Sequence, residues 1–376
     1  MRATRRQQWT ALPRTTRVRL VLAAGLSLVL GMAALLPQAA SLRVEANLMR
    51  RASLAMAETI DAVRSERLER DQAIDPILDP NGTGLIGVEI SPLTTTLGQL
   101  GAKRTTTNPN TAGLVTLLLL SAGVESGSTV AINASGSFPA LILATLHAAQ
   151  TLDATPLLIV SLSSSMYGAN DETFALLDIL DCYAGVGFEA VAATVGGSDD
   201  LGRGLDADTV SHLERAIDER GIPRLTPASL SDAVAQRMEI LLQASSTGNV
   251  DCFVNIGGSW ASMGTDSEIL HIPPGLTVFV DEAPAPEGRG MIFEFLNRGT
   301  PVIHLLNIRD LAAEYGLPWD PSPLPEAGDG DLYLATNTET HRRVWPAYVW
   351  LGAIAALFVV PLGRHRTSAA GSDRPV

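Results

Sequence analysis

The chain has 376 residues, of which 46% are hydrophobic and 18% charged, and its formal net charge at pH 7 is -13. This length allows one or two domains with a substantial core, and the apolar composition suits a globular domain joined to membrane segments. The acidic balance argues against non-specific nucleic-acid binding, which needs a basic face. Six arginines lie in residues 1–19 and three in residues 364–376, so the chain between these tails is more acidic still.

An apolar segment follows the basic N-terminus. Residues 20–36 are an uninterrupted run of apolar or small side chains, close to the roughly 20 residues that span a bilayer. We predict a transmembrane helix over residues 20–40 and a cytoplasmic tail over residues 1–19, because arginines favour the cytoplasmic side. A cleaved signal peptide is the alternative, since the segment ends in the small residues of PQAAS.

Residues 41–75 are predicted to form a stalk helix that leaves the membrane. Apolar side chains recur there at intervals of three and four, which gives the helix one apolar stripe. This stripe consists of Leu48, Ala52, Met56, Ile60 and Val63. It would face either the core or a partner, and the prolines of DPILDPNGTG end the helix.

Between residues 76 and 316, short apolar runs alternate with helical segments. The predicted strands are STVAINA, PLLIVSL, EAVAATV, DCFVNI, LTVFV and TPVIHLL. The predicted helices are LVTLLLLSAGV, FPALILATLHAAQTL, ETFALLDILDCYA, ADTVSHLERAIDER and IRDLAAEYG. This alternation predicts an α/β domain with a Rossmann-like parallel sheet covered by helices on both faces.

The C-terminal part leads back to the membrane. Residues 317–343 are rich in proline and are predicted to form an extended arm. A second apolar run with aromatic residues at its start predicts a transmembrane helix over residues 344–363 and a cytoplasmic tail over residues 364–376. Two spans with both termini in the cytoplasm make this a two-pass cell-membrane protein whose α/β domain is extracytoplasmic.

Four polar loops rich in glycine or serine follow predicted strands, at residues 133–139, 161–170, 196–204 and 257–264. Ligands bind beyond the carboxyl ends of the strands in an open parallel sheet, so these loops should gather at one edge. The ligand-binding residues expected there are Ser135, Gly136, Ser137, Asn170, Gly197, Asp199, Asp200, Arg203, Gly257 and Gly258.

The first of these loops, NASGSFPALILA, allows two interpretations. The N–H groups of Gly136, Ser137 and Phe138 would open a helix, and such an end attracts a carboxylate or phosphate. Alternatively, Ser135 or Ser137 is a catalytic nucleophile on a strand-to-helix turn, although a proline replaces the last glycine of that pattern. A hydrolase would also need a histidine, for which His304 at the end of a predicted strand is the candidate.

Cofactor and metal chemistry is not indicated. No Walker A sequence occurs, so we expect no ATP hydrolysis by this chain. Asp199, Asp200 and Arg203 could hold a cation or an amino-acid group, or they could form a solvated acidic loop. Cys182 and Cys252 lack metal-type spacing and are predicted to be buried free thiols, with a disulfide as the alternative. We expect neither a cofactor nor a metal site.

Lys103 is the only lysine in the chain, within QLGAKRTTTNPN. Lysine is a compact charge on a flexible stem, and its pKa changes readily on burial. Together with Arg104, Thr105 and Asn108 it forms a locally basic, hydroxyl-rich and amide-rich segment that suits an anion. The alternative is that the two cations pair with nearby acids such as Glu89.

Six stretches, taken together, resemble the poly-gamma-glutamate system protein family. They are NGTGLIGVEISPLTTTLGQLGAKRTTTNPN, SGSFPALILATLHAAQ, SSSMYGANDETFALLDIL, GGSDDLGRGL, NIGGSWASMG and PVIHLLNIRDLAAEYGLPWDPSPLPE, and they cover most of residues 81–326. One departure is Tyr167, where the family pattern has tryptophan. The resemblance transfers no catalytic residue to this chain.

The resemblance implies a membrane-anchored component of poly-γ-glutamate biosynthesis or export, found beside the ligase that makes the polymer. Its partners would be the poly-γ-glutamate chain or the synthase complex in the membrane, bound through the extracytoplasmic domain. The second hypothesis is an extracytoplasmic serine hydrolase or transferase that acts on γ-glutamyl chains through Ser135 or Ser137.

Overall fold

The computed structural model describes residues 41–183, 188, 190–197, 200–281 and 283–335, with single residues at 14, 18, 21, 22, 25 and 352. The chain divides into two units, of which Arg43–Leu334 is the larger; the other comprises Met1–Leu42 and Ala335–Val376. Both predicted transmembrane segments belong to the smaller unit and lie almost entirely outside the described residues. Within the described part of the chain, no helix is long and apolar enough to cross a membrane.

A six-stranded sheet forms the centre of the larger unit, in the order β7-β3-β2-β8-β10-β9. Its strands are β2 (Thr129–Ser135), β3 (Thr155–Ser161), β7 (Ala190–Thr194), β8 (Cys252–Ile256), β9 (Gly275–Thr277) and β10 (Val302–Leu305). All neighbours pair in parallel except β9, which lies antiparallel to β10 at the edge. The predicted α/β fold with a mostly parallel sheet is therefore confirmed.

The order of the strands reverses between β2 and β8. The chain first builds outward from β2 through β3 to β7, and then returns to the other side of β2 to add β8 and β10. The connections that follow β2 and β8 therefore leave the sheet in opposite directions. Such a switch point opens a crevice at the carboxyl ends of the strands, where ligands bind in this class of sheet.

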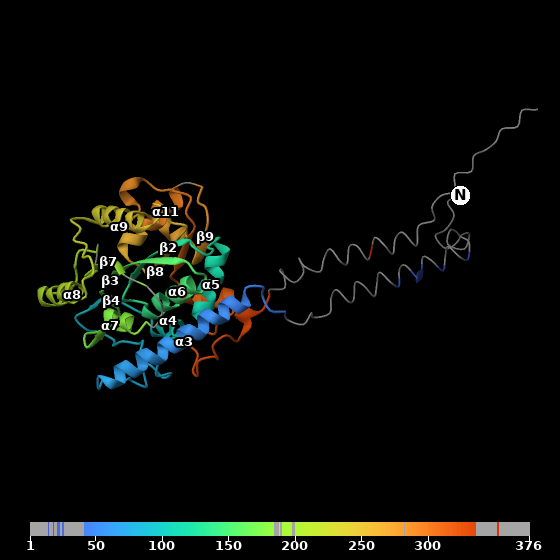
Figure 1. Cartoon of the computed structure of the whole chain (residues 1–376), viewed down its shortest axis with the longest axis horizontal. Helices are drawn as coiled ribbons and strands as arrows, with labels where there is room; N and C mark the ends of the chain where they lie inside the picture. Colours follow the sequence, from blue (N-terminus) through green and yellow to red (C-terminus); the bar gives the residue numbers. More distant parts are fainter. Residues whose placement is uncertain are drawn as a thin grey trace, which may run out of the picture. The chain divides into compact units, whose positions relative to one another are not determined.

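Helices cover both faces of the sheet, as Figure 1 shows. On one face lie α5 (Asn110–Ser121) and α6 (Pro139–Thr151), and on the other lie α9 (Leu230–Ala244) and α11 (Met291–Asn297). Each face of the sheet has its own hydrophobic core, and alternate β2 side chains pack into the two cores. Val130 and Ile132 lie in one core, and Ala131 lies in the other. All seven residues of β2 are buried, which explains the apolar run Val130–Ile132 at its centre.

The predicted stalk helix is part of the core of this unit. It forms α3 (Ala46–Glu69), which is shorter than predicted and packs against α5 and α6. Four residues of the predicted stripe are buried, whereas Leu48 is only partly buried and Met49 takes its place. Of the two interpretations of the stripe, the core-packed one therefore describes the structure.

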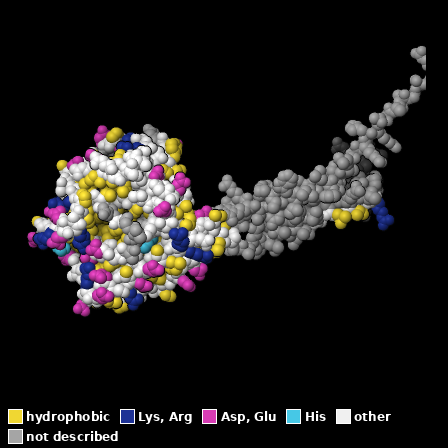
Figure 2. All heavy atoms as spheres, in the orientation of Figure 1, with side chains coloured by type: hydrophobic (Ala, Val, Ile, Leu, Met, Phe, Trp, Pro, Cys, Tyr) yellow, Lys and Arg dark blue, Asp and Glu magenta, His cyan; other side chains and the backbone are white. Residues whose placement is uncertain are grey.

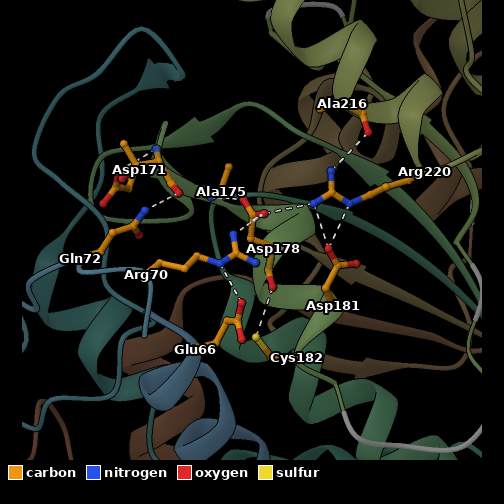
Figure 3. A network of polar contacts seen from close by, with 11 residues as sticks. Glu66, Arg70, Gln72, Asp171, Ala175, Asp178, Asp181, Cys182, Ala216 and Arg220 are labelled. Carbon is orange, nitrogen blue, oxygen red and sulfur yellow. Dashed lines mark hydrogen bonds and ion pairs between the residues drawn. The ribbon is translucent and has the colours of Figure 1, made fainter. Parts of the chain in front are cut away.

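Ion pairs join the C-terminal end of α3 to the helices beside it (Figure 3). Asp178 lies on α7 (Leu176–Asp181), and its Oδ1 is 3.0 Å from Arg70 Nη1 and 3.1 Å from Arg220 Nη2. Arg220 follows α8 (Ala207–Glu219), so one carboxylate connects three segments of the chain. These side chains are partly exposed to water, and each pair therefore stabilises the fold only modestly.

Residues 317–334 of the proline-rich arm are part of the larger unit. Asn110 Nδ2 donates hydrogen bonds to the carbonyl oxygens of Glu326 and Asp329, at 3.0 and 3.1 Å. The hydroxyl of Tyr333 donates to Asn110 Oδ1 at 2.7 Å. One buried asparagine at the start of α5 thus holds this arm in place, while residues 336–343 lie outside the described residues.

Some elements differ from the predictions. The helices α4 (Leu100–Thr106), α9 and α11 were not predicted, and α7 is shorter than ETFALLDILDCYA because Phe174–Ala175 forms a short strand. Both cysteines are free thiols, so the alternative of a disulfide is wrong. Cys252 is buried as predicted, but Cys182 is only partly buried, and burial raises the pKa of both thiols.

Candidate functional site

A pocket of about 420 Å³ opens at the carboxyl edge of the sheet, beside the switch point between β2 and β8. Its volume lies within the range of about 300–1,000 Å³ that is usual for small-ligand sites. The walls come from the carboxyl ends of five strands and the loops that follow them, and from the segment that leads from β1 (Thr94–Thr96) into α4. The lining residues fall in the ranges 95–103, 135–138, 161–165, 196–200, 258–260 and 306–309.

All four predicted loops contribute to this pocket. From the predicted site residues, the structure brings together Lys103, Ser135, Ser137, Gly197, Asp200 and Gly258. The reason is the one used for the prediction, since parallel strands deliver their carboxyl ends to a common edge. Gly197 has a φ of +83°, and its N–H donates to Ser163 Oγ at 2.7 Å, so this glycine shapes the pocket wall.

Arg104, Thr105 and Asn108, which were predicted together with Lys103, are not among the residues that line the pocket. Arg104 forms a bidentate ion pair with Asp320, with both N–O distances at 2.7 Å, so its partner is not Glu89. Thr105 accepts the N–H of Asp320 at 2.8 Å, and the buried Asn108 accepts the N–H of Asn110 at 3.0 Å. Arg104 and Thr105 therefore join α4 to the proline-rich arm, whereas Asn108 contacts the first residue of α5.

Three other predicted residues shape loops. The side chain of Asn170 bonds both backbone groups of Val88, and the N–H of Gly136 donates to Ser161 O at 2.9 Å. Gly257 has a φ of +87° and donates to Leu305 O at 3.1 Å.

Of the remaining three predicted residues, Arg203 and His304 are not among those that line the pocket. Arg203 is exposed, and Asp199 lies outside the described residues. His304 lies inside β10, is buried, and faces Asn255 Nδ2 at 2.8 Å. Because Asn255 donates, His304 Nδ1 accepts, and burial lowers the pKa of this histidine to about 4.

Lys103 lies inside the protein, with only 3% of its surface exposed. Its Nζ donates to the carbonyl oxygen of Ser137 and lies 2.7 Å from Ser165 Oγ. The ring of Phe138 lies beneath the amine, with its centroid 3.6 Å from Nζ. Burial lowers the pKa of Lys103 to about 7, because the ammonium loses water and no carboxylate among the described residues compensates it.

Ser165 is held by two strands and by the turn before α6. It belongs to β4 (Ser164–Ser165), which pairs in parallel with β1 (Thr94–Thr96). Its N–H donates to Ser137 Oγ at 3.0 Å, while the adjacent Ser164 Oγ donates to Gly136 O at 3.0 Å. Ser165, Ser137 and Lys103 are therefore fixed against one another at the pocket wall.

A buried ion pair supports the floor of the pocket. Arg237 on α9 is fully buried and pairs with Asp200, which is 4% exposed and lines the pocket. Asp200 Oδ1 also accepts hydrogen bonds from Ser161 Oγ at 3.0 Å and Thr194 Oγ1 at 2.8 Å. Arg237 Nε donates to Asn133 Oδ1 at 3.1 Å, so this network joins three neighbouring strands.

Sequence reasoning missed Arg237 because α9 was not predicted. A signal was present, since Ala233, Val234, Met238 and Leu241 share one face of the helix with Arg237. An arginine in the apolar stripe of an amphipathic helix is a buried charge, which needs a partner inside the protein.

The rim of the pocket combines an exposed cation with apolar side chains. Arg309 lines the pocket and lies over the ring of Trp319, with its guanidinium carbon 4.6 Å from the ring centroid. Trp260 is 44% exposed and Leu97 is 88% exposed, and both line the same pocket. At the pocket opening, Arg309 therefore offers a ligand an exposed positive charge, and Trp260 and Leu97 offer apolar contacts.

Metal chemistry has no ligand set in the part of the chain that the structure describes, where no three histidine, cysteine or acidic side chains gather. No protein-family model, curated protein or solved structure matches this chain. The assignment of a function therefore depends on the pocket, whose serine hydroxyls, buried amine and rim arginine suit a ligand with carboxylate and carbonyl oxygens.

Proposed function

We propose that this chain is a membrane-anchored component of poly-γ-glutamate biosynthesis or export, and that its α/β unit binds the anionic polymer in the pocket at the switch point. The observation that carries the proposal is the charge around the pocket. Lys103 and Arg309 line it, and Asp200, the one acid among the described lining residues, pairs with the buried Arg237. The pocket is therefore locally cationic in a chain of net charge -13.

Local recognition is required because the remaining surface would repel a polyanion. Acidic and basic side chains are interspersed on the face that Figure 2 shows, without a broad basic area. A γ-linked glutamate chain carries one free carboxylate and one amide carbonyl per residue. Arg309 suits the carboxylate, and the serine hydroxyls of the wall suit the carbonyl oxygens.

The membrane anchoring in this proposal rests on the two predicted spans. With both termini in the cytoplasm, the α/β unit would lie on the extracytoplasmic side of the membrane. The polymer emerges on that side, and the synthase complex could contact the unit there. Protease added to intact spheroplasts should then degrade the α/β unit. Protection of the unit until the cells are lysed would place it on the cytoplasmic side and contradict this topology.

Binding can be measured by titrating the full-length chain, purified in detergent, with a γ-linked glutamate pentamer. We expect Arg309→Ala to weaken binding about fivefold, because one partly exposed charge pair contributes roughly 1 kcal/mol. The matched control is Arg298→Ala, since Arg298 is also exposed but does not line the pocket. Affinity should rise from pH 8 to pH 6 as Lys103 gains its proton, and it should fall with added salt.

Two results would overturn the proposal. One is the absence of pentamer binding at millimolar concentration. The other is an equal loss of affinity in Arg309→Ala and Arg298→Ala, which would show that the polymer responds to general surface charge and not to this pocket.

A further inference from the structure

We propose that Ser165 and Lys103 form a serine–lysine dyad that cleaves γ-glutamyl amide bonds in the pocket. The choice of substrate rests on the proposed function, whereas the dyad itself rests on the geometry of the two side chains. The dyad differs from the hydrolase predicted from the sequence. Its nucleophile is Ser165 in place of Ser135 or Ser137, and its base is Lys103 in place of His304.

The two reacting atoms are already in contact at the pocket wall. Lys103 Nζ lies 2.7 Å from Ser165 Oγ, and both residues line the pocket. A nucleophile within hydrogen-bond reach of a base that is oriented by a third group is the arrangement that activates a serine. Here the third group is the carbonyl oxygen of Ser137, which accepts a hydrogen bond from Nζ and fixes its position.

The surroundings of Lys103 allow the amine to act as a base. Besides Lys103 itself, the charged side chains among the described lining residues are Asp200, which pairs with Arg237, and Arg309 at the exposed rim. None of the described carboxylates contacts Nζ, and burial lowers the pKa of Lys103 to about 7. Near neutral pH, part of the population therefore holds a neutral amine, whose lone pair can accept the Ser165 proton while an N–H still donates to Ser137 O.

The reaction would proceed in two steps. Lys103 Nζ takes the hydroxyl proton as Ser165 Oγ bonds to the amide carbon; the C–N bond then breaks, and Nζ returns the proton to the leaving amine. Water then gives a proton to Nζ as its oxygen attacks the ester carbon, and Oγ leaves and regains that proton. The net change is an amide and water converted to a γ-carboxyl group and an amine.

Donors for the developing oxyanion lie beside the dyad. Ser137 Oγ accepts the N–H of Ser165, and its own hydrogen has no acceptor among the described residues. The N–H groups of Ser137 and Phe138, which immediately precede α6, also donate to no oxygen in the described chain. Unpaired donors at the positive end of a helix suit a negative oxygen that forms only in the transition state.

The first experiment incubates the full-length chain with the γ-linked glutamate pentamer and measures shorter products by mass spectrometry. Ser165→Ala and Lys103→Met should each lower kcat/KM at least about 100-fold, the usual scale of a lost general base or nucleophile. Ser211→Ala is the control, because Ser211 is an exposed serine on α8 that bonds only its own helix. In the wild type, kcat/KM should rise with pH through a midpoint near 7, a readout that a purely structural Lys103 would not give.

A second experiment uses a small substrate, so that its result does not depend on recognition of the polymer. The small acyl donor p-nitrophenyl acetate should place an acetyl group on Ser165, which peptide mass spectrometry locates, and Lys103→Met should prevent it. If Ser165→Ala does not fold, Ser165→Cys keeps a nucleophile at the same place, and its alkylation by iodoacetamide should slow when Lys103 is also replaced.

The two proposals fail in different ways. If the chain binds the pentamer but leaves it intact, and Ser165 takes no acetyl group, the dyad is wrong and polymer binding stands. If Ser165 is acetylated in a Lys103-dependent manner but the pentamer neither binds nor reacts, the dyad stands and the polymer assignment falls.

Discussion

Replacing Arg237 with methionine should destabilise the protein strongly, because it leaves the carboxylate of Asp200 buried without its partner. Arg237 is fully buried and Asp200 is 4% exposed, so water cannot take over the role of the guanidinium. Three further hydrogen bonds from Arg237 to Asn133, Ser161 and Thr194 would also be lost, at 3.1–3.4 Å.

The magnitude follows from the loss of one partner of a buried ion pair, which typically costs about 3–5 kcal/mol. We therefore expect a loss of about 4 kcal/mol.

Urea unfolding of the full-length chain, followed by far-UV circular dichroism, measures this loss. Arg237→Met should lower the free energy of unfolding by about 4 kcal/mol, and Asp200→Leu combined with Arg237→Met should recover most of it, because apolar pairs can replace buried ion pairs. Arg298→Met, at an exposed position, should stay within about 0.5 kcal/mol of the wild type. A loss below about 1 kcal/mol in Arg237→Met would refute the account of the pocket floor.

Three further predictions concern titration and backbone geometry. From pH 7 to 9, the free energy of unfolding of the wild type, measured in urea relative to Lys103→Met, should rise by about 2 kcal/mol. The reason is that burial lowers the pKa of Lys103 to about 7, so over this range the unfolded chain binds more protons than the folded one. As the pH falls from 6.5 to 4, the free energy of unfolding of the wild type should drop by about 3 kcal/mol relative to His304→Gln. Burial lowers the pKa of His304 to about 4, so the histidine of the unfolded chain takes up its proton at a higher pH than the folded one. An unchanged difference across either pH range would contradict the corresponding burial. Gly197→Ala should cost about 1–3 kcal/mol in thermal unfolding, because its φ is +83° and a Cβ would lie 2.7 Å from Arg203 O; an unchanged melting temperature would refute the strain.

The strands and the position of the pocket follow from simple patterns in the sequence. β2 could be predicted because a strand buried on both faces is rich in apolar and β-branched residues, as Val130, Ala131 and Ile132 show. The gathering of the loops that contain Ser137 and Gly258 follows from parallel pairing, which places strand ends at one edge. Neither conclusion needs side-chain detail.

The chemistry of the pocket depends on contacts that local patterns do not reveal. Lys103 lies in a helix of seven residues whose threonines have low helix propensity, so α4 gives a weak signal. Its contact with Ser165 joins residues 62 positions apart, and its burial depends on Phe138 from a third segment. The sequence therefore marks Lys103 as unusual, whereas the tertiary structure alone supplies its base-like environment.

The most direct test of the account is a crystal structure of the full-length Ser165→Ala variant with the γ-linked glutamate pentamer bound. We expect the oligomer in the pocket between β2 and β8, with a carboxylate at Arg309 and an amide carbonyl within about 3 Å of the donors at Ser137 and Phe138. An oligomer bound elsewhere on the protein, with this pocket empty, would contradict the central claim.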